Sequence, residues 1–381
     1  MQGRTIGALK HVRPLVSILV PAYNAEKWLA DTLRSALAQT WDRKEIIVVD
    51  DGSNDQTLSV ARSFESGILR VFTQAHQGAA ATRNNALSIS RGEFIQWLDA
   101  DDLLSPNKIA LQMEALEDTP NPRILLSGEW ARFLYRPTKA EFTPTCLWSD
   151  LSNVEWLMRK MEQNASMQTA TWLVSRELTE AAGPWDTRLL SDDDGEYFCR
   201  VLMASQGVCF VPGARVYYRY IGPQSLGYIG ACDRKRDALW LSMKLNVDYL
   251  LSICDSQRAR AACVRYLQNC IGAFYPERPD LFTLAQLLAS DLGGRLDAPR
   301  FPWKYRWIKR VFGWRVARLM ERNLQGIRWW LLRDWDRICL CLKSDPILSK
   351  EFSVPPAPDH LWSSVGCEKS PKAFSAKDRF Q

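Results

Sequence analysis

The chain has 381 residues, of which 46% are hydrophobic and 24% charged, and its formal net charge is +6. These proportions are those of a soluble globular protein and exclude wholesale disorder, while the length favours two structural units. The charge surplus is too small to indicate nucleic-acid binding, and we expect no nucleic-acid partner. Because the chain has only three histidines, carboxylates must carry any chemistry, rather than a zinc site or a catalytic histidine.

Cysteine usage and hydropathy bear on the compartment. The ten cysteines are scattered, form no C-x-x-C pair and follow no secretory signal, so we expect a reducing, cytoplasmic environment. The longest apolar stretches, such as "VSILVPA", are far shorter than the roughly 18 to 20 residues of a membrane span. The sequence therefore predicts a protein that does not cross a bilayer.

Short β-branched runs alternate with helical patterns from residue 15 onward. Strands are expected at 16–20, 45–50, 69–74 and 94–99, with helices within 25–39 and from about residues 55, 78 and 105. This alternation predicts an α/β fold with a mainly parallel central sheet and helices on both faces. In such sheets, ligands bind beyond the carboxyl ends of the strands.

Four regions are expected along the chain. Residues 1–14 form an N-terminal tail and residues 15–230 form the α/β domain, whose second half, 121–230, is a less regular α+β continuation. Residues 231–345 lack strand alternation and predict a helical, basic and tryptophan-rich C-terminal region. Residues 346–381 contain too few spaced apolar residues for a packed element and are expected to be disordered.

Polar and acidic motifs follow three of the predicted strands: "PAYN" (21–24), "DDGS" (50–53) and "DADD" (99–102). Each motif alone is typical of turns and helix caps. Together they gather like charges at one edge of a sheet, which is unfavourable without a cation. Asp99 and Asp101, two positions apart, can face one site, and all-oxygen ligands suit Mg²⁺ or Mn²⁺ bound together with substrate phosphates. Asp102 is expected to cap the following helix.

Four motifs in order, "VSILVPAYN", "EIIVVDDGSNDQT", "QGAAATRNNAL" and "FIQWLDADDLLSP", closely resemble those of family 2 inverting glycosyltransferases. The resemblance covers about residues 15–225 and implies the GT-A fold, typical of nucleotide-diphospho-sugar transferases. It also implies metal-dependent transfer of a sugar, with inversion, from a nucleoside-diphosphate sugar to a hydroxyl acceptor. A UDP-sugar donor is favoured. A saccharide or lipid-linked saccharide acceptor is expected, in the synthesis of cell-surface polysaccharide or glycoconjugate.

The resemblance also assigns donor-side roles. Pro21, Ala22 and Tyr23 would line the nucleotide base, Asp51 would hydrogen-bond it, and Arg83 would approach the nucleotide or diphosphate. Asp99 and Asp101 match the family's D-x-D pair, with Asp101 the expected metal ligand and Asp99 the second candidate. The full predicted nucleotide-sugar-binding set is Pro21, Ala22, Tyr23, Asn24, Asp51, Gly78, Arg83, Asp99, Ala100 and Asp101.

The acceptor side needs a general base, and "LLSDDDGEYFCRVL" (189–202) supplies candidates. The family usually shows Glu-Asp followed, six residues after the Asp, by Arg, and Asp193, Asp194 and Arg200 keep that spacing. Asp194 is therefore the expected base and Asp193 the reserve. The alternative is an acidic helix start without catalytic function.

Other residues near these motifs keep two interpretations each. Trp172 and Trp185 are either core residues, the more common case, or platforms for a sugar ring. Whether Arg219 or Ser225 touches the donor stays open.

The segment 301–335 holds nine Lys/Arg against two acidic residues, and six of the sixteen tryptophans. One interpretation is a helical subdomain with its tryptophans packed inward. The other is an interfacial helix that attaches the protein peripherally to the anionic inner face of the cell membrane, which is our hypothesis.

Two rival functions remain for comparison. A nucleotide-sugar-forming nucleotidyltransferase would need a Gly-rich Arg/Lys loop after the first strand, where this chain has "PAYNAE". A catalytically inactive nucleotide-sugar-binding protein of the same fold would not need the carboxylates that this chain retains.

Overall fold

The computed structural model describes residues 13–118, 121–222, 229, 232–299 and 306–342. The predicted tail at 346–381, most of the tail at 1–14, and Ser225 lie outside these residues.

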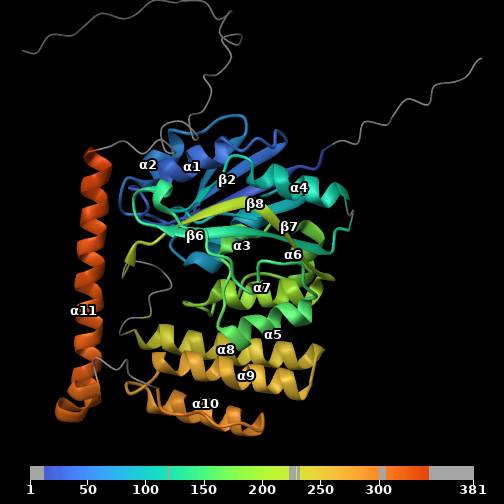
Figure 1. The fold of residues 1–381 in the computed structure, drawn as a ribbon. Helices are drawn as coiled ribbons and strands as arrows, with labels where there is room; N and C mark the ends of the chain where they lie inside the picture. Colours follow the sequence, from blue (N-terminus) through green and yellow to red (C-terminus); the bar gives the residue numbers. More distant parts are fainter. Residues whose placement is uncertain (1–12, 119–120, 223–228, 230–231, 300–305, 343–381) are drawn as a thin grey trace, which may run out of the picture.

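The first half of the chain forms the predicted α/β alternation (Figure 1). Its elements are β1 (Val16–Ala22), α1 (Leu29–Leu37), β2 (Lys44–Asp50), α2 (Thr57–Arg62), β3 (Leu69–Thr73), α3 (Ala79–Ser88) and β4 (Phe94–Trp97). The sheet order is β3-β2-β1-β4-β7, parallel throughout except for the antiparallel edge strand β7 (Val174–Ser175). β1, β2 and β4 are buried almost throughout, as their continuous apolar runs require.

A second, three-stranded sheet follows, with the order β5-β8-β6. It is built from β5 (Leu103–Leu104), β6 (Ile124–Phe133) and β8 (Gly207–Arg219), and α4 (Lys108–Asp118) packs against it. The helical elements between these strands are η1 (Pro137–Lys139), α5 (Asn153–Gln163), η2 (Thr169–Thr171), α6 (Arg176–Ala182) and α7 (Asp193–Ala204). The less regular α+β continuation predicted for 121–230 is thus confirmed.

The C-terminal region is helical, as predicted. It contains α8 (Asp233–Ile253), α9 (Gln257–Cys270), η4 (Ile271–Ala273), α10 (Pro279–Asp291) and α11 (Arg306–Leu342). Figure 1 shows α8, α9 and α10 stacked below the sheet, with α5 and α7 between them and the strands. One hydrophobic core runs through both regions, because Trp172 and Phe198 belong to the same buried cluster as Val247 and Leu267.

The last described helix, α11, runs along the side of the molecule, apart from this stack (Figure 1). Its backbone breaks at Gly313, which has φ 79° and ψ 176°, so two helical segments meet there. Within the described ranges, every helix is either too short or too polar to traverse a lipid bilayer.

Candidate functional site

The loops that follow β1 and β2 are joined by hydrogen bonds. The Asn24 backbone N–H donates to the Ser53 hydroxyl at 3.0 Å, and the Asn24 side-chain oxygen accepts from the Asn54 backbone N–H at 2.9 Å. Asn24 has φ 48°, a left-handed conformation that asparagine tolerates better than most residues. The two polar motifs "PAYN" and "DDGS" therefore form one surface at the carboxyl edge of the sheet.

Asp51, at the end of β2, organises the loop that leads into α3. Its buried carboxylate accepts from the backbone N–H groups of Gln77 and Gly78, at 2.9 and 2.8 Å, and from the Gln74 side chain at 2.8 Å. Nδ1 of His76 lies 2.9 Å from the same carboxylate. These four partners occupy both oxygens, so Asp51 fixes the loop; its expected contact with a base stays a prediction.

An aromatic pair lies at the mouth of this edge. The Tyr23 and His76 rings stack with centroids 4.1 Å apart and an interplanar angle of 22°. Both residues are exposed, and Tyr23 is 43% accessible. A flat, exposed ring next to Pro21 and Ala22 is suited to stacking on a planar ligand. His76 was not predicted as a site residue, although it lies only two residues before the predicted site residue Gly78.

Arg83 of α3 bridges the two acidic clusters. One guanidinium nitrogen donates to Asp99 at 2.8 Å and another to Asp193 at 2.5 Å, and the side chain is 5% exposed. Although burial acts to lower it, the Asp193 and Asp99 carboxylates hold the pKa of Arg83 above its usual value. The guanidinium also lies over the ring of Trp185, 4.4 Å from its centroid. The carboxylates predicted for the donor side and for the acceptor side thus meet around one cation.

The D-x-D pair brings two carboxylates together, one of them strongly buried. Burial, and after it the nearby Asp99 carboxylate, raise the pKa of Asp101 to about 7. Ala100, between them, is 9% exposed. The described residues contain no group of three or more His, Cys, Asp or Glu side chains that could hold a metal by themselves. The residues fit a hard cation such as Mg²⁺ that takes two carboxylates from the protein and its other oxygens from a substrate.

Asp102 does not cap the following helix, contrary to the expectation from sequence. Its fully buried carboxylate accepts from the Arg219 backbone N–H at 2.8 Å and from the Gln168 side chain. Burial, followed by the charge of Asp101, raises the pKa of Asp102 well above its usual range. The residue ties the D-x-D loop to β8 and η2, because a buried carboxylate takes whatever donors lie within reach.

Arg219 lies beneath the same loop. It is 2% exposed, and its Nε donates to the Asp101 carbonyl at 2.9 Å. Its guanidinium donates to Asp31 of α1 at 3.3 Å and lies 4.5 Å from the Trp28 ring centroid. These contacts give Arg219 a role in positioning the D-x-D backbone.

The two candidate bases differ in their surroundings. The Asp193 side chain is 7% exposed and paired with Arg83, and burial, the largest effect, raises its pKa to about 6. Asp194 is half-buried, and its carboxylate accepts from the Thr169 hydroxyl at 3.2 Å and from the Gly195 backbone N–H at 2.9 Å. Asp194 is thus held by neutral donors and retains access to solvent.

The helical region supports this acidic turn from below. The Asp192 carboxylate accepts from the Ser242 hydroxyl of α8 at 2.5 Å, and Asp192 adopts a left-handed φ of 57°. A side chain at Gly195 would place its Cβ 2.2 Å from the same carboxylate, so the Asp192 side chain would have to move away from Ser242 to admit it. Arg200, predicted from the family spacing, makes two hydrogen bonds to Glu196 at 2.7 and 2.9 Å.

The two tryptophans with open roles are core residues. Trp172 and Trp185 are each 1% exposed. Trp185 stacks on Tyr197 with centroids 3.9 Å apart and supports Arg83 from the other side. Neither ring is accessible to a sugar in this structure.

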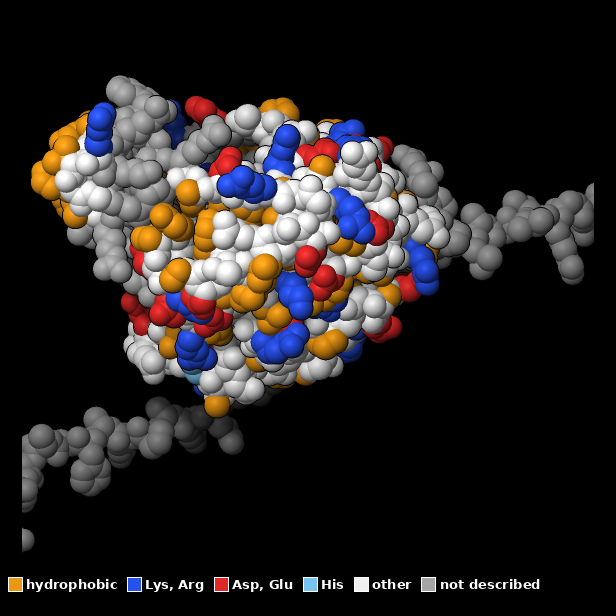
Figure 2. Space-filling view, turned by 90° about the horizontal axis from the view of Figure 1, so that it is seen from below, with side chains coloured by type: hydrophobic (Ala, Val, Ile, Leu, Met, Phe, Trp, Pro, Cys, Tyr) orange, Lys and Arg blue, Asp and Glu red, His pale blue; other side chains and the backbone are white. Residues whose placement is uncertain are grey.

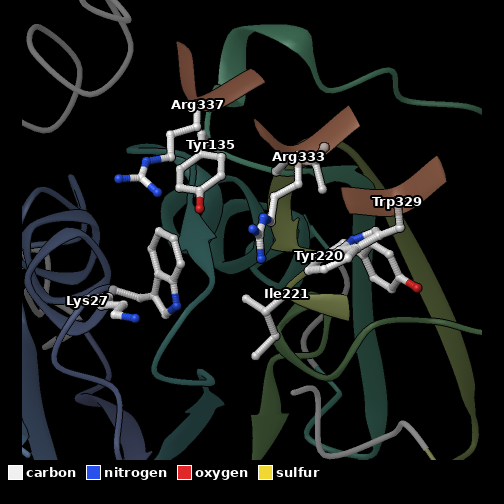
Figure 3. A pocket seen from close by; sticks show the side chains of 9 residues that line it. Lys27, Tyr135, Tyr220, Ile221, Trp329, Arg333 and Arg337 are labelled. Atoms are coloured by element: carbon white, nitrogen blue, oxygen red, sulfur yellow. The ribbon is translucent and has the colours of Figure 1, made fainter. Parts of the chain in front are cut away.

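A separate pocket lies between α11 and the residues that precede α1 (Figure 3). Its volume is about 210 Å³, and its lining residues are Lys27, Trp28, Leu134, Tyr135, Tyr220, Ile221, Trp329, Arg333 and Arg337. Figure 3 shows Arg333 and Arg337 reaching from α11 toward the side that carries Lys27. Sequence reasoning missed this pocket, because α11 and α1 are separated by almost the whole chain.

The predicted site residues therefore come together at one edge of the sheet. Asn24 and Asp51 lie on joined loops, and Asp99 and Asp193 share Arg83. Their contacts with a donor, a metal or an acceptor stay predictions.

Residues 17–164 match the family model of Glycosyl transferase family 2. An uncharacterized glycosyltransferase of Rickettsia typhi is 39% identical over 113 residues, 30% of this chain and 35% of that protein. The UDP-Glc:alpha-D-GlcNAc-diphosphoundecaprenol beta-1,3-glucosyltransferase WfgD of Escherichia coli is 38% identical over 103 residues, 27% of this chain and 41% of that protein. The chain spans less than half the length of these relatives.

Solved structures show the fold. TarS of S. aureus, residues 1–349, in complex with UDP-GlcNAc, superposes with a TM-score of 0.57 at 19% identity, covering 73% of this chain and 80% of that chain. The same TarS segment without a named ligand gives a TM-score of 0.55 at 18% identity. The predicted GT-A fold is confirmed.

Proposed function

We propose that this chain is a metal-dependent, inverting glycosyltransferase. It moves a sugar from a nucleoside-diphosphate sugar to a hydroxyl of a saccharide or lipid-linked saccharide, in the synthesis of a cell-surface polysaccharide or glycoconjugate. The observation that carries the proposal is Arg83, whose guanidinium holds Asp99 on the donor side and Asp193 on the acceptor side. A transfer reaction between two substrates needs these two sets of carboxylates next to each other.

The donor side is the carboxyl edge of β1, β2 and β4. The exposed Tyr23 ring is available to a nucleotide base, and the loop fixed by Asp51 closes the neighbouring wall. Asp101 and Asp99 would hold Mg²⁺ or Mn²⁺, which would stabilise the charge that develops on the leaving diphosphate. A UDP-sugar is the favoured donor, in keeping with the donor named for the E. coli relative.

Asp194 is the proposed general base. A base must accept a proton from the acceptor hydroxyl, so its carboxylate must be within reach of that hydroxyl. The Asp193 side chain is 7% exposed and held by Arg83, whereas Asp194 is half-buried and held by a hydroxyl and a backbone N–H. The activated hydroxyl attacks the anomeric carbon from the face opposite the diphosphate. The new bond to the acceptor oxygen forms as the bond to the diphosphate oxygen breaks, so the nucleoside diphosphate leaves and the configuration is inverted.

Binding and turnover of two variants test this scheme. In thermal-shift measurements, UDP with Mn²⁺ should stabilise the wild type, since a ligand bound to the native state raises its stability by mass action. Asp101→Asn should lose both this stabilisation and transfer from a UDP-sugar. Asp194→Asn should keep the stabilisation and lower kcat by about 10² to 10⁴-fold.

Asp280→Asn is the matched control, because Asp280 lies on α10 with a side chain that is 56% exposed. It should behave as wild type in both assays. Transfer that persists in a chelator, or full turnover by both site variants, would contradict the scheme. NMR of the product's anomeric proton reports the configuration, and retention would exclude the inverting step.

A further inference from the structure

The second segment of α11, after Gly313, carries a row of exposed apolar side chains. The row consists of Val316, Met320, Leu324, Ile327, Leu331, Trp335 and Ile338, which are between 39% and 66% exposed. Successive members are three or four residues apart, so they lie on one face of the helix. Figure 2 shows hydrophobic side chains gathered at the edge of the molecule where α11 lies.

The opposite face of α11 is attached to the catalytic domain. The Asp336 carboxylate accepts from the backbone N–H groups of Tyr135 and Arg136 at 2.9 and 3.2 Å, and from Arg136 Nε at 2.7 Å. Trp329 packs edge-on against Tyr220 with ring centroids 6.3 Å apart. Because this face is fixed, the apolar row points away from the protein. A row of this length is larger than the scattered apolar residues of an ordinary surface and calls for an occupant.

The net charge of α11 favours an anionic occupant, although Arg333 and Arg337 of this helix line the pocket that faces the domain. Residues 306–342 contain nine Lys/Arg and three Asp/Glu, a surplus of +6 that equals the surplus of the whole chain. The rest of the chain is therefore neutral in sum. A second copy of α11 would bring two such surpluses together, whereas an anionic lipid surface would attract them. Exposed tryptophans at positions 307, 330 and 335 suit the boundary between headgroups and acyl chains.

We propose that α11 is a membrane-surface helix. Its apolar row enters the headgroup and acyl boundary of an anionic bilayer, and its Asp336 face holds the catalytic domain against that surface. The helix lies on the bilayer, in keeping with a mixed polar and apolar sequence that does not suit a spanning helix. This inference is independent of the proposed enzymatic function.

The same helix connects the bilayer to the site. Trp329 lines a pocket together with Trp28, Trp28 packs on Arg219, and Arg219 donates to the Asp101 carbonyl. The pocket also receives Lys27 and Arg333, which are complementary to phosphate groups. A helix is about 10 to 12 Å across with its side chains, which sets the spacing between the bilayer and this pocket.

Vesicle flotation of the full chain tests the proposal. With vesicles of phosphatidylcholine and phosphatidylglycerol, the wild type should float at low salt, and the bound fraction should fall at high salt because screening weakens the attraction. Vesicles of phosphatidylcholine alone should bind less. The variant Leu324→Ser/Leu331→Ser/Trp335→Ser should lower the partition coefficient at least about tenfold, because three large apolar side chains no longer leave water.

The matched control is Leu284→Ser/Leu287→Ser on α10, where both side chains are exposed, at 44% and 58%. It should float like the wild type, and circular dichroism should show equal helicity for all three proteins. Flotation of the α11 variant at the wild-type level would overturn the proposal. A second result would also overturn the proposal. If the wild type sediments as a dimer without vesicles, the α11 variant sediments as a monomer and the wild type does not float, the apolar row binds a second copy of the chain.

Discussion

Arg83 is the residue on which the geometry of the site depends most. Its side chain is 5% exposed, and its partner Asp193 is 7% exposed. Arg83→Met should lower the free energy of unfolding by about 3 to 5 kcal/mol, because the change leaves a buried carboxylate without its cation. Urea denaturation measures the difference.

An exposed ion pair offers the matched comparison. Arg123 pairs with Glu177 at 2.7 Å, and the two side chains are 52% and 47% exposed. Arg123→Met should therefore cost less than about 1 kcal/mol. Equal losses in the two variants would mean that the Arg83 bridge adds nothing beyond an ordinary surface pair.

Single residues also show how far the sequence could predict the site. Asp51, Asp99 and Asp101 could be placed at one edge because parallel strands end together, and the strand pattern was strong. The pairing of Arg83 with Asp193 could not be predicted, since it spans 110 positions and leaves no local pattern. For the same reason, Asp102 was predicted to cap the following helix, whereas its carboxylate is buried between β8 and η2.

At the scale of elements, Asp336 makes several of the described contacts that hold α11. Asp336→Ala removes the hydrogen bonds from the backbone N–H groups of Tyr135 and Arg136. It also removes the ion pair with the partly buried Arg136 side chain. A charged hydrogen bond contributes about 1.5 to 3 kcal/mol, so amide hydrogens in the second half of α11 should exchange at least about tenfold faster. Hydrogen-exchange mass spectrometry measures this directly.

Asp334→Ala serves as the control for that measurement. Asp334 forms an ion pair with its neighbour Arg333 at 2.9 Å, within the same helix. Its loss should leave the exchange of α11 within about threefold of wild type, because neighbouring surface pairs contribute less than about 1 kcal/mol. If both variants accelerate exchange alike, Asp336 does not anchor the helix.

The orientation of α11 shows what an element's sequence leaves undecided. An amphipathic, tryptophan-rich pattern is the same whether its apolar side faces a core or a solvent boundary. Trp329 faces the domain while Trp335 is 66% exposed, although both lie on one helix. The direction is set by Asp336 and its partners on the strand-end loop at 135–136, which no periodicity reveals.

At the scale of the whole molecule, the helices after residue 231 divide into two kinds. α8 and α9 complete the core of the α/β domain: Met243, Val247 and Leu250 are fully buried and belong to the cluster that contains Trp172. The Ser242 hydroxyl of α8 also donates a hydrogen bond to Asp192, beside the proposed base. By contrast, α11 lies outside this stack.

Two shortened chains separate these roles. A chain of residues 1–299 should unfold cooperatively. Its free energy of unfolding should be lower than that of the full chain by less than about 3 kcal/mol, because it loses the Asp336 hydrogen bonds but keeps the core. A chain of residues 1–230 should fail to fold. Each large buried side chain contributes about 1.5 to 3 kcal/mol to stability, and the sum over those of α8 and α9 exceeds a typical free energy of unfolding of about 5 to 15 kcal/mol. Calorimetry distinguishes the two. Cooperative unfolding of the 1–230 chain would show that the strands and α5 to α7 form a self-sufficient domain, and that the helical stack is an addition to it.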